Sequence, residues 1–219
     1  DRLRSRGLGD VYKIQVLILA GFLGFWKVRY DAGHEAQGQA RDELWAVPSK
    51  YDEEEPEQAG TVEEVVYDTR AYATDGRSVK KSAYVYLPYG YSKEKEYNIL
   101  YLMHGTGDDE KYWLKTNPYN KTMLDNMIAD GDIEPLIVVT PTFYVEDDCA
   151  DDLDQLTYSF AKELRNDLMP EIESSYSTYA KSADDKGFSK SRDHRAFAGL
   201  SRGAVSYTHL RAHETGAYL

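Results

Sequence analysis

A serine between two glycines is the feature of this sequence that most clearly carries chemistry. The segment Gly199-Leu200-Ser201-Arg202-Gly203 has the G-x-S-x-G spacing of a nucleophile elbow. In such a turn the glycines relieve crowding where a strand passes sharply into a helix, so the serine hydroxyl is lifted out of the sheet. We therefore predict that Ser201 is a catalytic nucleophile, that Gly199 and Gly203 form the elbow, and that the N–H of Arg202 binds an oxyanion. An ordinary tight turn is the alternative interpretation.

A second glycine-rich segment, His104-Gly105-Thr106-Gly107, follows an apolar run that ends at Met103. A buried strand that ends in His-Gly provides a loop whose backbone N–H can complete an oxyanion hole from the neighbouring strand. We assign that N–H to Thr106. We expect His104 and Gly105 to support the loop, with His104 forming hydrogen bonds rather than acting as the catalytic base. The Lys-Ser/Thr of a phosphate-binding loop is missing, and so is the dinucleotide-binding spacing.

The order of predicted strands and helices indicates an open α/β sheet with helices on both faces. Runs of β-forming or apolar residues predict strands at residues 62–67, 83–88, 98–103, 136–140 and 195–200. A turn signal at residues 74–77 makes the first two an antiparallel hairpin. The third and fourth are unbroken apolar runs, which are typical of parallel strands covered by helices. The last strand delivers Ser201, and right-handed crossovers are expected between the parallel strands.

Helical spacing of apolar residues predicts the elements between these strands. The predicted helices cover residues 121–130 and 153–168, with a further turn starting at Pro170. The first helix stops at Gly131, and Asp151 or Asp152 is placed to cap the start of the second. Residues 184–189 are interpreted as a surface loop.

The charge balance and the single cysteine exclude several classes of partner. The chain has 219 residues, of which 42% are hydrophobic, and this suits a globular domain with a core. Its net charge of −12 argues against a nucleic-acid partner and against an anionic membrane surface. Cys149 alone can close no intrachain disulfide and can build no thiolate metal site.

An acidic segment ahead of the second predicted helix could suggest a calcium site. Its acidic residues are Glu146, Asp147, Asp148, Asp151, Asp152 and Asp154. They lack the D-x-D-x-D-G spacing and the closing glutamate of a calcium loop. We therefore interpret the segment as a solvated loop that caps a helix, and we expect no bound metal.

Both ends of the chain resemble translated sequencing-adapter DNA rather than protein. Codons for residues 5–13 have a reverse complement that lies, in another frame, within codons for residues 205–215. Two ends of one natural gene have no reason to be complementary. We therefore expect residues 1–15 and 205–219 to be artefacts, with coincident natural peptides as the alternative.

An apolar segment and a polar one precede the predicted domain. Residues 16–30 contain an apolar run followed by Lys27 and Arg29, and we expect an export signal or a membrane anchor rather than a core helix. Residues 31–60 are acidic and polar with no apolar period, which is typical of a linker. The predicted α/β domain is then residues 61–204.

Several motifs within residues 61–204 occur in an order that resembles one enzyme family. They are residues 97–105, Trp113, and residues 127–131, 135–141, 168–176 and 193–201. Together they are similar to the esterase-D-like α/β-hydrolases, and within these to the feruloyl and acetyl-xylan esterases of carbohydrate esterase family 1. The resemblance implies an extracellular or cell-envelope attached bacterial serine esterase. It would hydrolyse feruloyl or acetyl esters on plant polysaccharide through an acyl-enzyme, without a cofactor. Arg202 stands where many relatives have Met, which keeps the backbone role but alters the pocket rim.

The resemblance also implies an acid and a histidine that follow the nucleophile on later strands. His209 and His213, with Glu214 beside them, mimic such a pair, but they fall in the segment interpreted as adapter, so we reject them as triad members. A serine hydroxyl without a general base is a weak nucleophile. We therefore expect the later strands of the α/β-hydrolase sheet to be missing here, the fragment to be inactive and its parent to be an esterase.

Two other functions fit the same predicted fold. One is a thioester hydrolase or acyltransferase that uses the same serine, and the other is a non-catalytic carbohydrate-binding module. Tyr112 and Trp113 also allow two interpretations: they line a pocket for an aromatic acid, or they pack under the loop that starts at His104.

Overall fold

The structure, a computed structural model, describes residue 51, residues 56–145 and residues 152–206. The segments predicted to be artefact, export signal or linker lie largely outside the described residues: 1–15, 16–30, 31–50, 52–55 and 207–219. The chain divides into two compact units, residues 1–59 with 118–134 and residues 60–117 with 135–219. Within the described part, no helix is long and apolar enough to cross a membrane.

The smaller unit contains the helix α3 (Tyr119–Ala129), which confirms the helix predicted before Gly131. Gly131 has a φ of 71°, a left-handed conformation that glycine adopts at little cost at the end of a helix. Tyr51, from the segment predicted to be a linker, belongs to this unit. Its side chain is buried, and its hydroxyl donates a hydrogen bond of 2.6 Å to Asp132.

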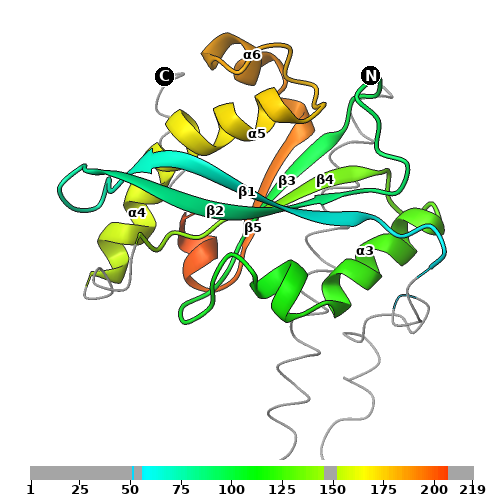
Figure 1. Ribbon diagram of the computed structural model, residues 1–219, viewed down its shortest axis with the longest axis horizontal. Helices are drawn as coiled ribbons and strands as arrows, with labels where there is room; N and C mark the ends of the chain where they lie inside the picture. Colours follow the sequence, from blue (N-terminus) through cyan, green and yellow to red (C-terminus); the bar gives the residue numbers. More distant parts are fainter. Residues whose placement is uncertain (1–50, 52–55, 146–151, 207–219) are drawn as a thin grey trace, which may run out of the picture. The chain divides into compact units, whose positions relative to one another are not determined.

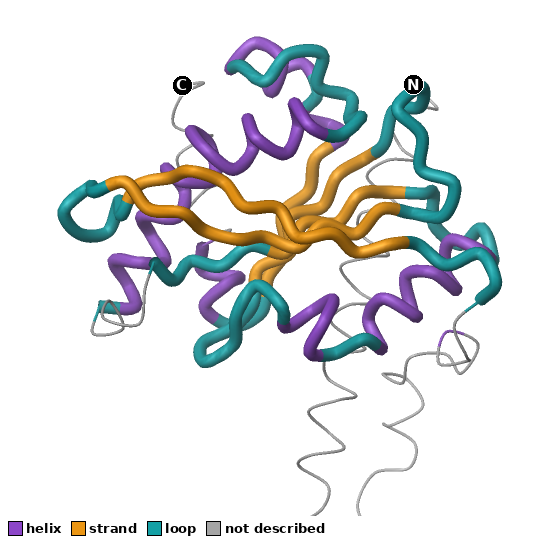
Figure 2. Tube along the Cα trace, in the orientation of Figure 1, coloured by secondary structure: helices purple, strands orange, loops and turns teal. Residues whose placement is uncertain are grey.

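The larger unit is built on a mixed five-stranded sheet, and Figures 1 and 2 show how its strands lie. Its strands are β1 (Thr61–Arg70), β2 (Ser78–Leu87), β3 (Asn98–Met103), β4 (Leu136–Thr140) and β5 (Arg195–Gly199). Their order is β1-β2-β4-β3-β5. The strand β2 is antiparallel to its neighbours β1 and β4, whereas β3 is parallel to β4 and to β5. The predicted α/β sheet and its N-terminal hairpin are therefore confirmed.

Helices follow β4 and lead to β5. They are α4 (Leu153–Glu163), the π-helical η5 (Leu164–Leu168), α5 (Met169–Ser175), α6 (Asp185–Lys190) and the 3-10 turn η6 (Arg192–His194), while the π-helical η3 (Tyr112–Thr116) follows β3. Asp152 caps α4, because its carboxylate accepts a 2.9 Å hydrogen bond from the N–H of Gln155. The prediction of a surface loop at residues 184–189 was wrong. The carboxylate of Asp184 caps α6 instead, accepting from the N–H of Gly187 at 2.7 Å.

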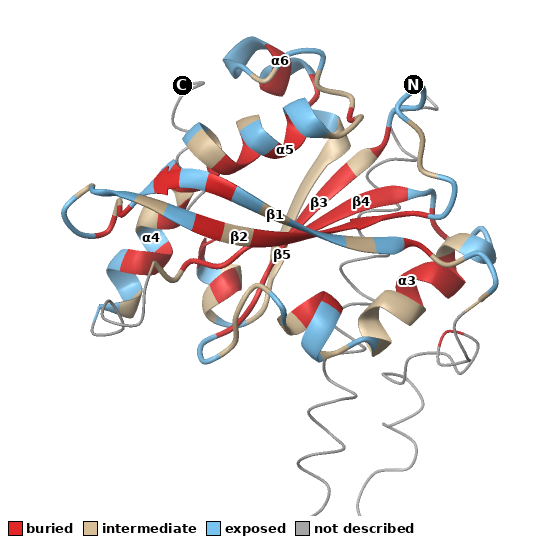
Figure 3. Cartoon of the chain, viewed as in Figure 1, coloured by how far each residue is buried: buried red, intermediate tan, exposed pale blue. Residues whose placement is uncertain are grey.

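The core of the larger unit follows the period-two alternation of the strands. Side chains of one parity, including Val85, Ile99, Tyr101 and Val139, form one buried cluster with apolar residues of α4, η5 and α5. Figure 3 shows how burial concentrates in β2, β3 and β4. The edge strand β5 differs, because all five of its residues are only half-buried.

Candidate active site

Ser201 occupies a sharp turn directly after β5. Its φ of 51° makes it the only non-glycine residue with a positive φ among the described residues. A side chain in the left-handed region costs about 1–2 kcal/mol, and strain of this kind clusters at functional sites. Ser201 is also exposed, so a substrate can reach it.

The glycines of the turn are required by close backbone contacts. A Cβ at Gly199 would lie 2.5 Å from the carbonyl carbon of Gly203, and a Cβ at Gly203 would lie 2.5 Å from the carbonyl oxygen of His104. The turn is closed by a 2.8 Å hydrogen bond from the N–H of Gly203 to the carbonyl of Leu200. These contacts leave no room for a side chain at position 199 or at position 203.

The loop that starts at His104 lies directly against this turn. The N–H of Leu200 donates to the carbonyl of Met103 at 3.2 Å, and a Cβ at Gly105 would be 3.3 Å from the side chain of Leu200. The exposed Thr106 follows, in a turn closed by a 3.4 Å hydrogen bond from the N–H of Asp108 to the carbonyl of Gly105. The structure therefore brings together the two segments that the sequence singled out.

Arg202 begins a helical turn that covers residues 202–206. The N–H groups in the first turn of a helix have no acceptor within the helix, so the N–H of Arg202 is suited to bind an oxyanion. Its guanidinium forms an ion pair with Asp154 at the start of α4.

The side chain of His104 is completely buried and serves the loop. Its Nδ1 lies 2.7 Å from the carbonyl oxygen of Gly105, and its Nε2 lies 2.8 Å from Oγ1 of Thr142. Burial lowers the pKa of His104, and the nearby charge of Lys81 acts in the same direction. A neutral histidine with both nitrogens engaged agrees with the predicted supporting role.

A buried ion pair is linked to His104 through Thr142, and sequence reasoning missed it. Nζ of Lys81 lies 2.7 Å from the carboxylate of Glu163 and donates a 2.7 Å hydrogen bond to the carbonyl of Thr142. Burial lowers the pKa of Lys81 and raises the pKa of Glu163, while their mutual attraction opposes both shifts. The signal was present, because Lys81 shares the strand parity of the core residue Val85.

Tyr144 holds the other end of the same loop. Its hydroxyl accepts a 3.1 Å hydrogen bond from the N–H of Gly107, whose φ is 86°. Its ring stacks on His104 with 5.5 Å between centroids. The loop is therefore held at Gly105 and at Gly107, on both sides of Thr106.

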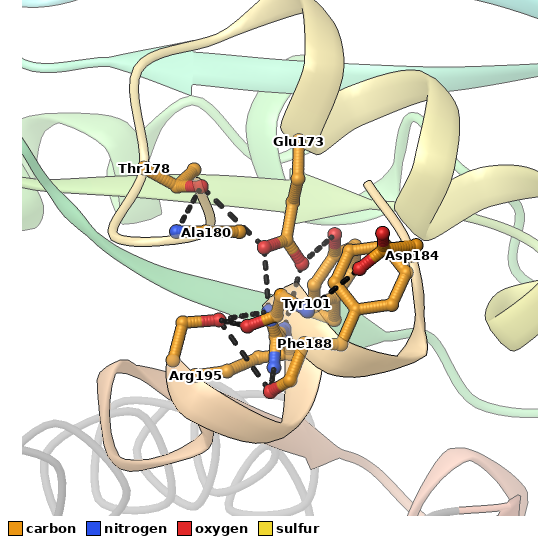
Figure 4. Close-up of polar contacts among 9 residues, drawn as sticks. Tyr101, Glu173, Thr178, Ala180, Asp184, Phe188 and Arg195 are labelled. Carbon is orange, nitrogen blue, oxygen red and sulfur yellow. Dashed lines mark hydrogen bonds and ion pairs between the residues drawn. The ribbon is translucent and has the colours of Figure 1, made fainter. Parts of the chain in front are cut away.

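A second buried ion pair fixes the start of β5, the strand that carries Ser201. Figure 4 shows the guanidinium of Arg195 facing the carboxylate of Glu173, which extends from α5. Two hydrogen bonds of 2.6 Å join them, and the hydroxyl of Tyr101 donates to the same carboxylate at 3.1 Å. The guanidinium also donates to the carbonyl of Phe188 at 3.2 Å. The bidentate contact joins the first residue of β5 to α5.

Some of the remaining predicted residues are described by the structure and others are not. Trp113 is only 2% exposed and packs edge-on against the half-buried Tyr112, so its ring lies inside the fold. Among the described residues, no group of acidic, histidine or cysteine side chains could hold a metal. The rest lie outside the described residues: Cys149, His209, His213, Glu214 and the acidic residues 146–151.

The chain is similar in sequence to known proteins. Over 126 residues the chain is 44% identical to endo-1,4-beta-xylanase Y of Acetivibrio thermocellus, covering 58% of this chain and 11% of the relative. It is 37% identical to an endo-1,4-beta-xylanase/feruloyl esterase of Xylanibacter ruminicola, covering 57% of this chain and 16% of the relative.

A solved structure resembles the described fold as well. It is a serine-to-alanine mutant of the feruloyl esterase module from Clostridium thermocellum in complex with sinapinate. The match has a TM-score of 0.62 and 39% identity, and it covers 73% of this chain and 51% of the solved chain. The chain thus spans about half the length of that module and a smaller share of the curated relatives. The Esterase family model matches residues 78–218, which is more than half of the sequence, and the chain belongs to this family.

Proposed function

We propose that this chain provides the nucleophile and the oxyanion hole of a serine carboxylesterase that removes feruloyl or acetyl groups from plant polysaccharide. One observation carries the proposal: the exposed Ser201 has a strained φ of 51° at the tip of β5, and its turn packs against the loop that contains Thr106. This observation supports the proposal because acyl transfer requires a hydroxyl close to backbone N–H groups that can bind an oxyanion.

The reaction begins when Oγ of Ser201 attacks the carbonyl carbon of the ester and its proton passes to a general base. The carbonyl oxygen becomes an oxyanion, which the N–H groups of Thr106 and Arg202 stabilise. A single such donor contributes about 3–4 kcal/mol to the transition state. The bond to the sugar oxygen then breaks, the sugar oxygen takes the proton, and the acyl group remains on Ser201. Water repeats the sequence and releases the free acid, without a cofactor.

Neither of the two described histidines is placed to act as the general base. Both ring nitrogens of His104 are engaged, by Gly105 and Thr142. The other described histidine, His194, precedes β5, so the whole strand separates it in sequence from Ser201. Its Nδ1 bonds to Asn98 at 2.9 Å. Neither histidine is therefore the partner of the serine in this proposal.

The proposed substrate rests on the relatives. One relative has a name that combines endo-1,4-beta-xylanase with feruloyl esterase, and the solved module carries sinapinate. A feruloyl or acetyl ester on xylan is the substrate class that fits these names, and such an enzyme would act outside the cell, where the polysaccharide is. The acidic net charge of −12 agrees with a neutral carbohydrate partner rather than a polyanion.

The test is the release of ferulate from feruloylated xylan fragments, by the domain expressed together with its flanking sequence in the gene. Ser201→Ala should abolish hydrolysis. Ser174→Ala, on the exposed face of α5, should leave it unchanged. Hydrolysis that survives Ser201→Ala would refute the proposal, and faster turnover of S-acyl thiols than of these esters would assign the serine to thioester chemistry.

A further inference from the structure

A buried chain of hydrogen bonds connects β2 and α4 to the loop that contains Thr106. It starts at the carboxylate of Glu163, which accepts from Nζ of Lys81 at 2.8 Å and from the hydroxyl of Tyr67 at 2.6 Å. The Lys81 and Glu163 side chains are only 3% and 4% exposed. A buried ammonium needs further acceptors, and Lys81 finds one in the carbonyl oxygen of Thr142 at 2.7 Å.

Thr142 is the junction of this chain. Its carbonyl accepts from Lys81, while its Oγ1 accepts from the N–H of Tyr144 at 3.1 Å and lies 2.8 Å from Nε2 of His104. Thr142 is itself only 7% exposed, so its hydroxyl has no ready exchange with solvent. The backbone and the side chain of Thr142 are therefore both fixed by the surrounding protein.

The partners of His104 determine which of its nitrogens carries the proton. The carbonyl oxygen of Gly105 can only accept, so Nδ1 of the neutral ring must be the donor. Nε2 is then an acceptor, and the hydroxyl of Thr142 must donate to it. Burial is the main influence on the ring and lowers its pKa, whereas the contact with the Gly105 carbonyl and the charge of Asp109 raise the pKa and the charge of Lys81 lowers it. With the ring neutral, these contacts are consistent with one tautomer only, the one that carries the proton on Nδ1.

The hydrogen bond between His104 and the carbonyl of Gly105 also affects the N–H of Thr106, because both groups belong to one peptide unit. The carbonyl of Gly105 and the N–H of Thr106 belong to one planar trans peptide unit, in which they point in opposite directions. Holding the carbonyl therefore orients the N–H. This is the N–H that the proposed function assigns to the oxyanion hole, where the direction of the donor decides its strength.

We propose that Thr142, backed by the buried pair of Lys81 and Glu163, is a positioning residue for the oxyanion hole. It holds His104 in the tautomer that orients the peptide between Gly105 and Thr106. Thr142 contacts no reacting atom and acts only through His104. The inference rests on the proposed function, because it assigns a purpose to the N–H of Thr106 that only an acyl-transfer site requires.

The first test compares Thr142→Val with Thr142→Ser in the esterase assay, in the domain with its flanking sequence. Valine keeps the shape but removes the hydroxyl, whereas serine restores it. We expect kcat to fall about tenfold in Thr142→Val, less than the 10²–10³-fold loss of a whole donor, with KM and ferulate binding unchanged. Thr142→Ser should return kcat to within about twofold of the wild type. Equal losses in both variants, or an unchanged kcat in Thr142→Val, would overturn the inference.

The second test needs neither activity nor a variant that folds. In the wild-type chain labelled with ¹⁵N-histidine, long-range ¹H–¹⁵N spectra should identify His104 as the Nδ1–H tautomer at neutral pH. An Nε2–H tautomer would refute the inference directly. Failure of the proposed function has a different signature: ester hydrolysis would survive Ser201→Ala, whatever the tautomer of His104.

Discussion

Gly203 lies so close to His104 that a Cβ on the glycine would come within 2.5 Å of the carbonyl oxygen of the histidine. The two residues belong to different motifs, the serine turn and the loop after β3. Gly203 does not have a positive φ, so the need for glycine comes from space and not from backbone conformation. The backbones of the two halves of the proposed oxyanion hole are in direct contact, and their separation is set at this point.

We expect Gly203→Ala to lower kcat on feruloylated fragments by about 100-fold or more. The added methyl group must push the turn away from the loop, and a displacement of about 1 Å at a catalytic site costs about 10²-fold. Gly90→Ala is the matched control, since Gly90 has a φ of 67° and open space around its Cβ position. It should cost about 1 kcal/mol of stability by backbone strain and leave kcat unchanged. Comparable loss of activity in both variants would show that the effect is one of folding.

A second prediction concerns Arg202, whose role in the proposal belongs to its backbone. Arg202→Met should keep kcat within about threefold of the wild type, because the substitution retains the N–H that binds the oxyanion. The side chain is 27% exposed and its partner Asp154 is 66% exposed, and ion pairs with this access to water contribute little to stability. Steady-state kinetics on an acetylated and a feruloylated substrate would check this. A large loss on both would mean that the guanidinium itself contacts the reacting ester.

The sequence predicted the strands and helices of this fold better than it predicted which of them lie side by side. Strands and helices carry their signal locally, as period-two or helical spacing, and the turn at Ser201 is specified within five residues. The place of β4 between β2 and β3 depends on contacts between distant segments, which no local pattern encodes. The same holds for Lys81 and Glu163: each occupies a core-facing position on its own element, but only the fold pairs them. The α6 helix was missed because residues 184–189 were interpreted as a surface loop, whereas Asp184 caps the helix through the N–H of Gly187.

The ion pair that fixes the start of β5 leads to a prediction about stability. Glu173→Gln should lower the free energy of unfolding by about 3–5 kcal/mol, because it leaves the guanidinium of Arg195 buried without a counter-charge. Urea denaturation of the chain would measure the change. Asp68→Asn provides the control, since the pair of Asp68 with Lys80 is largely exposed and should not be measurably stabilising. Equal midpoints for Glu173→Gln and the wild type would mean that the ion pair of Arg195 with Glu173 contributes nothing to the free energy of unfolding.

The buried neutral His104 should make the fold sensitive to acid. Its pKa lies below the ordinary value of 6.5, chiefly because burial disfavours the charged ring. Below about pH 6.5 the unfolded chain therefore binds a proton that the folded chain does not, and stability is lost as the pH falls, by at most about 1.4 kcal/mol per pH unit for this residue. Urea midpoints measured from pH 7 to pH 5 should decrease, and His104→Gln, which cannot titrate, should show a shallower decrease. His194→Asn is the matched variant: burial also lowers the pKa of His194, but its ring is less buried, so the slope should change less. If the slope of His104→Gln equals that of the wild type, His104 titrates alike in the folded and unfolded chains, and burial does not lower its pKa.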